Sequence, residues 1–176
     1  ELVGRDNFVA GFSDSEAEIM GTIVRSLKNT TASNPSIKQM EAADAILILG
    51  EDVTNTAPRV ALGLRQSVRN KALELGEQMG LPPWQDAAIR NLAQDQRSPM
   101  MIISAMDTRL DDVASRCVSL AADDIASFGY AVAEVLAGGK SGDVAVNEAA
   151  EILLGAKKPL IVSGSSMLHS GIVNGA

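Results

Sequence analysis

Cysteine and histidine are almost absent from this sequence of 176 residues, which has only Cys117 and His169. A disulfide needs two cysteines, and a structural zinc ion or an iron–sulfur cluster normally takes four Cys or His ligands. The chain alone cannot supply either set, so we expect it to hold no metal. A lone cysteine in a strand is usually packed in a core. A histidine without a partner motif is expected to be a surface residue in the first turn of a helix.

Aromatic residues, positive charge and long apolar runs are also scarce. Lys and Arg number 15 against 22 Asp and Glu, which gives a formal net charge of −7, and aromatics make up 3% of the chain. Nucleic-acid binding needs a basic face, so we expect no nucleic-acid partner. No apolar run approaches the roughly 18 residues that cross a bilayer, so we expect no direct insertion into a membrane. The 46% of hydrophobic residues suffices for one or two units with an aliphatic core.

Short apolar runs alternate with stretches of helical periodicity. The runs at 45–49 and 99–104 have the composition of strands that are covered on both faces, and "KKPLIVSGSS" (157–166) repeats the pattern of a buried strand before a glycine. The stretch 117–120 is a shorter strand candidate. Helices are predicted over 13–28, 58–75, 83–92, 125–136 and 146–154, with a short one capped by Ser36. For the first helix, Ser13 is an N-cap candidate with Glu16 three residues later, the spacing of a capping box. The first of these helices is expected to face the core with Ala17, Met20, Ile23, Val24 and Leu27, and the third with Trp84, Ala88 and Leu92. This alternation predicts an α/β fold with a doubly wound, mostly parallel sheet and helices on both faces, a Rossmann-like architecture.

Ligands of such sheets bind outside the carboxyl ends of the strands. The first strand exit, 50–56, matches neither a dinucleotide fingerprint nor a phosphate-binding loop. The helix after it offers an anion a charge of roughly +0.5, whereas Glu51 and Asp52 bring roughly two negative charges. We therefore expect no pyrophosphate here. Gly50 is expected to permit a turn, and the acids to complement the helix dipole.

The second strand exit carries Asp107 and Arg109. In one interpretation, Asp107 accepts a hydrogen bond from a base or sugar hydroxyl and Arg109 binds a phosphate. In the other, Arg109 is neutralised by the neighbouring acids Asp107, Asp111 or Asp112 in an ordinary surface network. The third exit, 163–170, combines hydroxyls with a glycine and could form an anion nest.

Three stretches carry a resemblance to a known family: "MEAADAILILGEDVTNTAPRVALGLRQSVRNKA" (40–72), "PMMIISAMDTRLDDVASRCVSLAADD" (99–124) and "GAKKPLIVSG" (155–164). They resemble the molybdopterin-oxidoreductase family, in which one strand ends in Gly-polar-Asn-Pro and the next in Asp-x-Arg. Within that family the sequence is most similar to the G subunits of bacterial NADH-quinone oxidoreductase, respiratory complex I.

The resemblance implies a Rossmann-like domain of the molybdopterin-oxidoreductase type over 1–155 and the start of a following α/β unit over 156–176, within a longer polypeptide. It also implies a structural, non-catalytic part in the peripheral arm of the complex, which supports electron transfer from NADH to quinone. Iron–sulfur clusters are then expected elsewhere in the full-length polypeptide, with no cofactor in this stretch. The implied partners are the other subunits of complex I, and the implied location is the cytoplasmic side of the inner membrane, peripheral to it.

The sequence also departs from the family pattern. Cofactor-binding relatives read Gly-Ser-Asn-Pro where this chain has Gly50, Glu51 and Asp52, and they have a Pro-Gly-x-Asp turn where this chain reads "AADD" (121–124). Gly50 is kept, and Asp107 and Arg109 match the Asp-x-Arg of the family. We therefore take these five residues as candidates for a vestigial pterin-dinucleotide site.

Two other functions stay open from the sequence. One is a nucleotide- or pterin-dinucleotide-binding module with a working site at Asp107 and Arg109. The other is the central domain of a thiamine-diphosphate enzyme, because "AKKPLIVSGSS" (156–166) resembles the strand that opens such domains.

Overall fold

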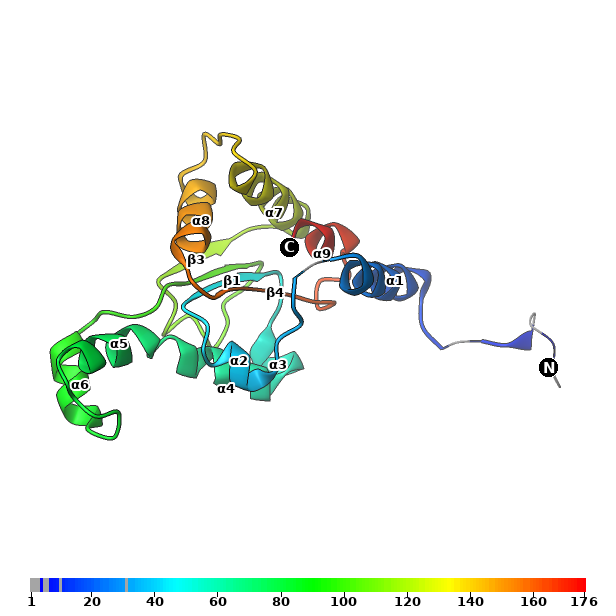
Figure 1. The fold of residues 1–176 in the computed structure, drawn as a ribbon. Helices are drawn as coiled ribbons and strands as arrows, with labels where there is room; N and C mark the ends of the chain where they lie inside the picture. The colour runs from blue at the N-terminus through cyan, green and yellow to red at the C-terminus, as the bar shows by residue number, and fades with distance from the viewer. Residues whose placement is uncertain (1–3, 5–6, 10, 31) are drawn as a thin grey trace.

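A parallel sheet lies between two layers of helices in the computed structural model, which describes residue 4 and residues 7–9, 11–30 and 32–176 (Figure 1). Helices α7 and α8 cover one face of the sheet, and α2 to α4 cover the other. The elements in chain order are α1 (Asp14–Asn29), α2 (Ile37–Met40), β1 (Ala45–Leu49), α3 (Val53–Thr56), α4 (Pro58–Ser67), α5 (Asn70–Gln78), α6 (Asp86–Ala93), β2 (Met100–Ser104), β3 (Arg116–Ser119), α7 (Ala122–Leu136), α8 (Val144–Gly155), β4 (Pro159–Ser163) and α9 (Ser170–Gly175).

The four strands are all parallel and lie in the order β3-β2-β1-β4. The chain runs outward from β1 to β2 and β3 and then returns across the sheet to β4, on the other side of β1. The direction of winding therefore reverses between β1 and β4. This reversal is the topological switch point, where open α/β sheets bind their ligands. The predicted fold class is confirmed.

The sheet separates two apolar clusters. Alternate residues of a strand point to opposite faces, so Leu47 and Leu49 pack with α7 and α8 while Ile46 and Ile48 pack with α4. β1 and β2 are buried at every position, as their composition predicts.

The last residues join this sheet. The register pairs Ala45 with Pro159 and Leu49 with Ser163, and α9 packs against α7. The sequence predicts that a following α/β unit begins at residue 156; the strand β4 and the helix α9 of that stretch lie against β1 and α7.

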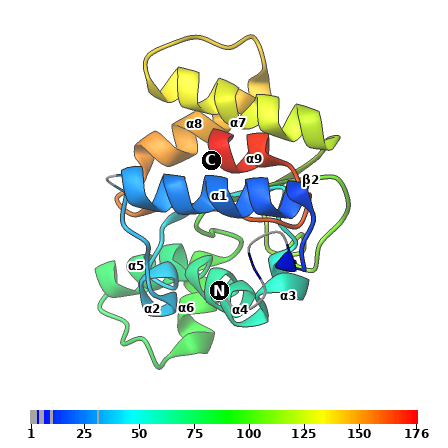
Figure 2. The same ribbon diagram turned by 90° about the vertical axis from the view of Figure 1, so that its right-hand side faces the viewer.

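The capping of α1 is confirmed, but its predicted core face is wrong. Ser13 and Glu16 form the expected capping box. The buried side chains are those of Ile19 and Thr22, whereas Met20 and Leu27 are each 55% exposed. The main partner of α1 is the short helix α9, which lies beside it in Figure 2 and covers only part of its surface.

The stretch between β1 and β2 also differs from the prediction. The helix expected over 58–75 is divided after Ser67, where the N–H of Ser98 donates to the carbonyl of Val68 at 2.9 Å. The next helix begins at Asp86 instead of Pro83, and Trp84 is 78% exposed. Helix α6 packs on α5 through Ile89, so the core face predicted there is wrong.

Candidate functional site

Gly50 turns the chain at the end of β1, as the sequence predicts. Its φ is +63°, a left-handed conformation that costs L-residues roughly 1–2 kcal/mol. A Cβ here would lie 3.0 Å from the side chain of Ile172 in α9. The Gly50 N–H donates to the carbonyl of Ile103 at 2.8 Å, which holds the turn against β2. Both the conformation and the space therefore require glycine.

Glu51 is the central residue of the switch point. Its side chain points from the end of β1 to the segment after β4, and the residue is only 7% exposed. The carboxylate accepts hydrogen bonds from Ser166 Oγ at 2.5 Å, from Ser166 N at 3.2 Å and from Thr56 Oγ1 at 2.5 Å. A Cβ on Gly164 would collide with this carboxylate. Glu51 therefore fills the space between the exits of β1 and β4.

The donors that surround Glu51 are those that an anionic ligand would use. The third strand exit contributes the N–H and the hydroxyl of Ser166, Thr56 of α3 adds a second hydroxyl, and the acceptor is a carboxylate of the chain itself. A phosphate that entered this space would have to displace the carboxylate or lie beside a like charge. The carboxylate of Glu51 therefore occupies the place at the strand exits where a ligand of this fold would bind.

Asp52 does not act on the helix that the sequence assigned to it. α4 has Ala57 at its N-cap position and no acid in its first turn, and Asp52 lies at the N-cap position of the short helix α3 instead. Instead, the carboxylate of Asp52 accepts from Thr54 Oγ1 and Asn55 Nδ2, each at 2.5 Å. The bond from Thr54, followed by that from Asn55, lowers the pKa of Asp52 below its usual value.

The exit of β2 contains the expected surface network, but a different arginine carries it. Arg65 binds Asp112 in a bidentate ion pair, at 2.7 and 2.8 Å, and donates to the carbonyl of Arg109 at 2.6 Å. Asp111 accepts from the hydroxyl and the N–H of Thr108. The side chain of Arg109 is exposed and makes no hydrogen bond or ion pair with any described residue.

Asp107 lies on the β3 side of the sheet. Burial is the main cause of the raised pKa of Cys117 in β3, and the negative charges of Asp111 and Asp107 raise it further. Glu51 faces the opposite way, toward β4. No hydrogen bond or ion pair within the described ranges joins Asp107 or Arg109 to Gly50, Glu51 or Asp52. The five sequence-predicted residues therefore form two separate groups.

Cys117 and His169 both differ from their expected surroundings. Cys117 is exposed because β3 is an edge strand, so its predicted core position is wrong. His169 precedes α9, and its Nε2 lies 2.8 Å from Asp123 Oδ1 in the first turn of α7. The Nδ1 atom of this histidine is buried and has no partner among the residues described, so no Ser-His-Asp relay is present in that part of the chain. No local motif could have indicated this pair, since 46 residues separate its members.

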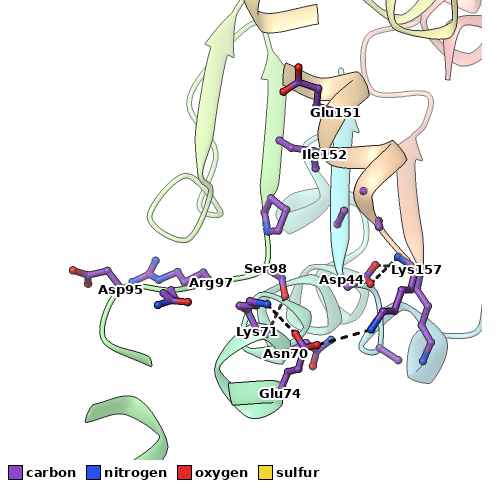
Figure 3. Close-up of a pocket in the computed structure, with 17 residues that line it drawn as sticks. Asp44, Asn70, Lys71, Glu74, Asp95, Arg97, Ser98, Glu151, Ile152 and Lys157 are labelled. Atoms are coloured by element: carbon purple, nitrogen blue, oxygen red, sulfur yellow. Dashed lines mark hydrogen bonds and ion pairs between the residues drawn. The ribbon is translucent and has the colours of Figure 1, made fainter. Parts of the chain in front are cut away.

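A charged cavity of about 810 Å³ lies at the other end of the sheet, at the amino ends of the strands (Figure 3). Three of the charged side chains in its lining, Lys71, Glu74 and Lys157, form ion pairs with one another. Glu74 lies 3.0 Å from Lys71 Nζ and 3.9 Å from Lys157 Nζ, and the carboxylate of Asp44 accepts from the N–H groups of Lys157 and Lys158. Because parallel sheets bind ligands at the carboxyl ends of their strands, we do not regard this cavity as the functional site.

The residues that the structure describes offer neither a membrane span nor a metal site. None of their helices is long and apolar enough to cross a membrane. No group of three or more His, Cys, Asp or Glu side chains among them is arranged to hold a metal ion.

Comparison with known proteins places the whole chain beside one type of polypeptide. The chain is 40% identical over 184 residues to the G subunit of NADH-quinone oxidoreductase from Pseudomonas fluorescens and 41% identical over 184 residues to that from Shewanella oneidensis; each alignment covers 100% of this chain and 20% of the relative. With the same protein of Escherichia coli K12 the identity is 36% over 174 residues, covering 94% of this chain and 19% of the relative. No protein-family model matches the chain. The resemblance to the G subunits of NADH-quinone oxidoreductase is confirmed, and the chain spans about a fifth of the length of these relatives.

Proposed function

We propose that this chain is a structural domain of the G subunit of NADH-quinone oxidoreductase, and that it supports the peripheral arm of the complex without carrying out chemistry itself. The similarity covers the chain from end to end at 35–41% identity. This similarity also covers residues 156–166, so the stretch that suggested a thiamine-diphosphate enzyme is explained equally by a G subunit.

The observation that carries this proposal is the buried carboxylate of Glu51. A working dinucleotide site in a doubly wound sheet needs open space and free donors at the switch point. Here the space is filled, and the donors of Ser166 and Thr56 already bind Glu51. In this proposal the fold is kept for its shape and for the surfaces that it offers to the rest of the complex, while electrons pass through clusters held elsewhere in the full-length polypeptide.

A comparison of assembly with turnover tests the proposal. Glu51→Ala should lower the amount of assembled complex in cells, because it weakens the domain. NADH:quinone turnover per assembled complex, normalised to bound flavin or iron, should stay at the wild-type value. A variant complex that assembles in full but turns over several times more slowly would contradict the structural role.

A second candidate function is anion binding at Arg109. The observation in its favour is that this guanidinium is exposed and has no side-chain partner within the described residues, whereas Arg65 takes the neighbouring acid Asp112. The wild-type chain and Arg109→Ala can be compared in a thermal-shift series with GDP, NAD and a pterin dinucleotide. A melting temperature that rises with ligand concentration in the wild type alone would establish this function, since a ligand that binds only the folded state stabilises it by mass action. On the structural proposal, both series are flat.

A further inference from the structure

Strand β4 has the composition of a central strand but lies at an edge. Its sequence "PLIVS" carries apolar side chains on both faces, like β1 and β2. Every residue of β1 and β2 is buried, whereas Pro159 is exposed and Ile161 is 38% exposed. The other edge strand, β3, reads "RCVS", and its arginine pairs with Glu148. Of the two edge strands, β4 has the more exposed aliphatic side chain, that of Ile161, whereas Val118 of β3 is half-buried.

The register shows which backbone groups of β4 are open. In a parallel ladder, alternate residues of a strand bond to the neighbour on one side. Ile46 and Gly50 donate to the β2 segment, so even-numbered residues of β1 face β2 and odd-numbered ones face β4. Because Leu47 is the register partner of Ile161, the even-numbered residues of β4 complete the ladder with β1. The N–H groups of Ile161 and Ser163 then point to the open edge, with the carbonyls of residues 159, 161 and 163.

An apolar groove of about 1040 Å³ runs beside this edge. Ile23 and Leu27 of α1 form one wall, and Leu160 and Ile161 of β4 form the other. The segment 32–35 and Val173 of α9 also contribute to its lining. Leu27 is 55% exposed, so the groove is open to solvent and not filled by the chain's own side chains.

We propose that the open edge of β4 pairs with a further parallel β-strand from the longer polypeptide of the intact subunit, whose apolar side chains occupy this groove. The inference rests on the proposed function, because the occupant belongs to a polypeptide about five times the length of this chain. Soluble proteins rarely leave a long apolar edge uncovered. Lys157, Lys158 and Pro159 protect only the start of the strand, and residues 160–163 have no charge to oppose pairing.

A parallel strand fits this edge better than a second copy of β4. Two copies related by a twofold axis through Ile161 would run antiparallel and place each Pro159 opposite the partner strand's residue 163. Proline has no N–H, so that arrangement loses one ladder bond at each end. A parallel strand loses only the single bond that the same proline cannot donate.

Amide hydrogen exchange on the intact subunit and on the isolated chain tests the pairing. The N–H groups of Ile161 and Ser163 should exchange at least about 100-fold more slowly in the intact subunit than in the isolated chain, because only the former pairs them. Those of Leu160 and Val162 bond to β1 and serve as the internal reference, protected in both. Equal rates for Ile161 and Ser163 in the two samples would overturn the proposal. So would protection in the isolated chain that increases with its concentration, since that result assigns the edge to a second copy.

A pair of variants provides the second measurement. Ile161→Asp places a charge in the groove, and Leu154→Asp places one on α8 at a residue that is 66% exposed and outside the groove. Both isolated chains should melt within a few degrees of the wild type, whereas only Ile161→Asp should reduce the yield of folded intact subunit several-fold. An intact Ile161→Asp subunit obtained in normal yield would contradict the inference. The structural role of the domain would then still stand, because turnover per assembled complex does not depend on this edge.

Discussion

Replacing Glu51 with alanine removes the carboxylate that ties the segment after β1 to the segment after β4. Three hydrogen bonds are lost, from Ser166 Oγ, Ser166 N and Thr56 Oγ1. Each bond to a charged acceptor contributes about 1.5–3 kcal/mol to stability, so their simple sum would be at least about 4.5 kcal/mol.

Two effects reduce that sum. Ser166 and Thr56 are themselves exposed, so water can satisfy the donors that the substitution leaves behind. Burial of a carboxylate also costs several kcal/mol, and the variant no longer bears that cost. We therefore expect Glu51→Ala to lower the free energy of unfolding by about 2 kcal/mol, within the range for loss of a buried polar network.

Urea unfolding of the 176-residue chain, followed by far-UV circular dichroism, measures this change. The single tryptophan, Trp84, is 78% exposed and would be a poor reporter of the core. With a slope of about 2 kcal/mol per M urea, the midpoint should fall by about 1 M. Glu77→Ala is the matched control, because Glu77 is exposed and its side chain contacts no described partner through a hydrogen bond or ion pair; its midpoint should hardly move.

A double-mutant cycle with Ser166→Ala assigns the loss to the contact between Glu51 and Ser166. If the carboxylate acts through Ser166, the two substitutions together should cost at least about 1 kcal/mol less than the sum of their separate effects. Additive effects, or a Glu51→Ala midpoint equal to that of the Glu77→Ala control, would refute the idea that this carboxylate closes the switch point.

Three further outcomes are expected. Gly50→Ala should destabilise the chain by about 2 kcal/mol or more in the same urea assay, since it combines a left-handed φ with a Cβ placed 3.0 Å from Ile172; a smaller loss would mean that the turn relaxes. Arg65 lowers the pKa of Asp112 below its ordinary value of 3.8, so the wild type should have a higher melting temperature than Asp112→Asn at pH 5 to 7. The difference in melting temperature should disappear as the pH falls through that lowered pKa, and a difference unchanged at pH 2 would refute the ion pair. Because the pKa of the Cys117 thiol is raised, the pH at which its alkylation by iodoacetamide is half-maximal should lie above that of a small-molecule thiol. Rates measured from pH 7 to 11 test this, and an equal or lower midpoint would show that burial and the nearby acids have no effect.

The strands and caps could be predicted from the sequence because local signals determine them. β1 extends over 45–49 as expected, since an apolar run of strand length between turn signals has few alternatives in a sheet covered on both faces. The capping boxes at Ser13 and Ser36 likewise depend on residues three positions away. The faces of α1 and α6 could not be predicted, because each packs against another short helix whose position the periodicity does not contain.

The contact that closes the candidate site could not be predicted either, because it joins two residues that are far apart in the sequence. Glu51 and Ser166 are 115 residues apart, and nothing in either segment indicates the other. From the sequence, Glu51 was an acid that would repel phosphate from a helix terminus. In the structure its acceptor oxygens satisfy donors of the kind that bind anions at strand exits, so it replaces the phosphate and does not merely repel it. This difference changes how the site could be reopened: neutralising the charge with Glu51→Gln would leave the side chain in the pocket, whereas Glu51→Ser would free both the space and the donors of Ser166. If the carboxylate of Glu51 fills a former ligand site, only the serine variant should gain measurable affinity for GDP in an NMR titration. An equal gain in affinity in both variants would show that the charge of Glu51, and not its side-chain volume, excludes the ligand.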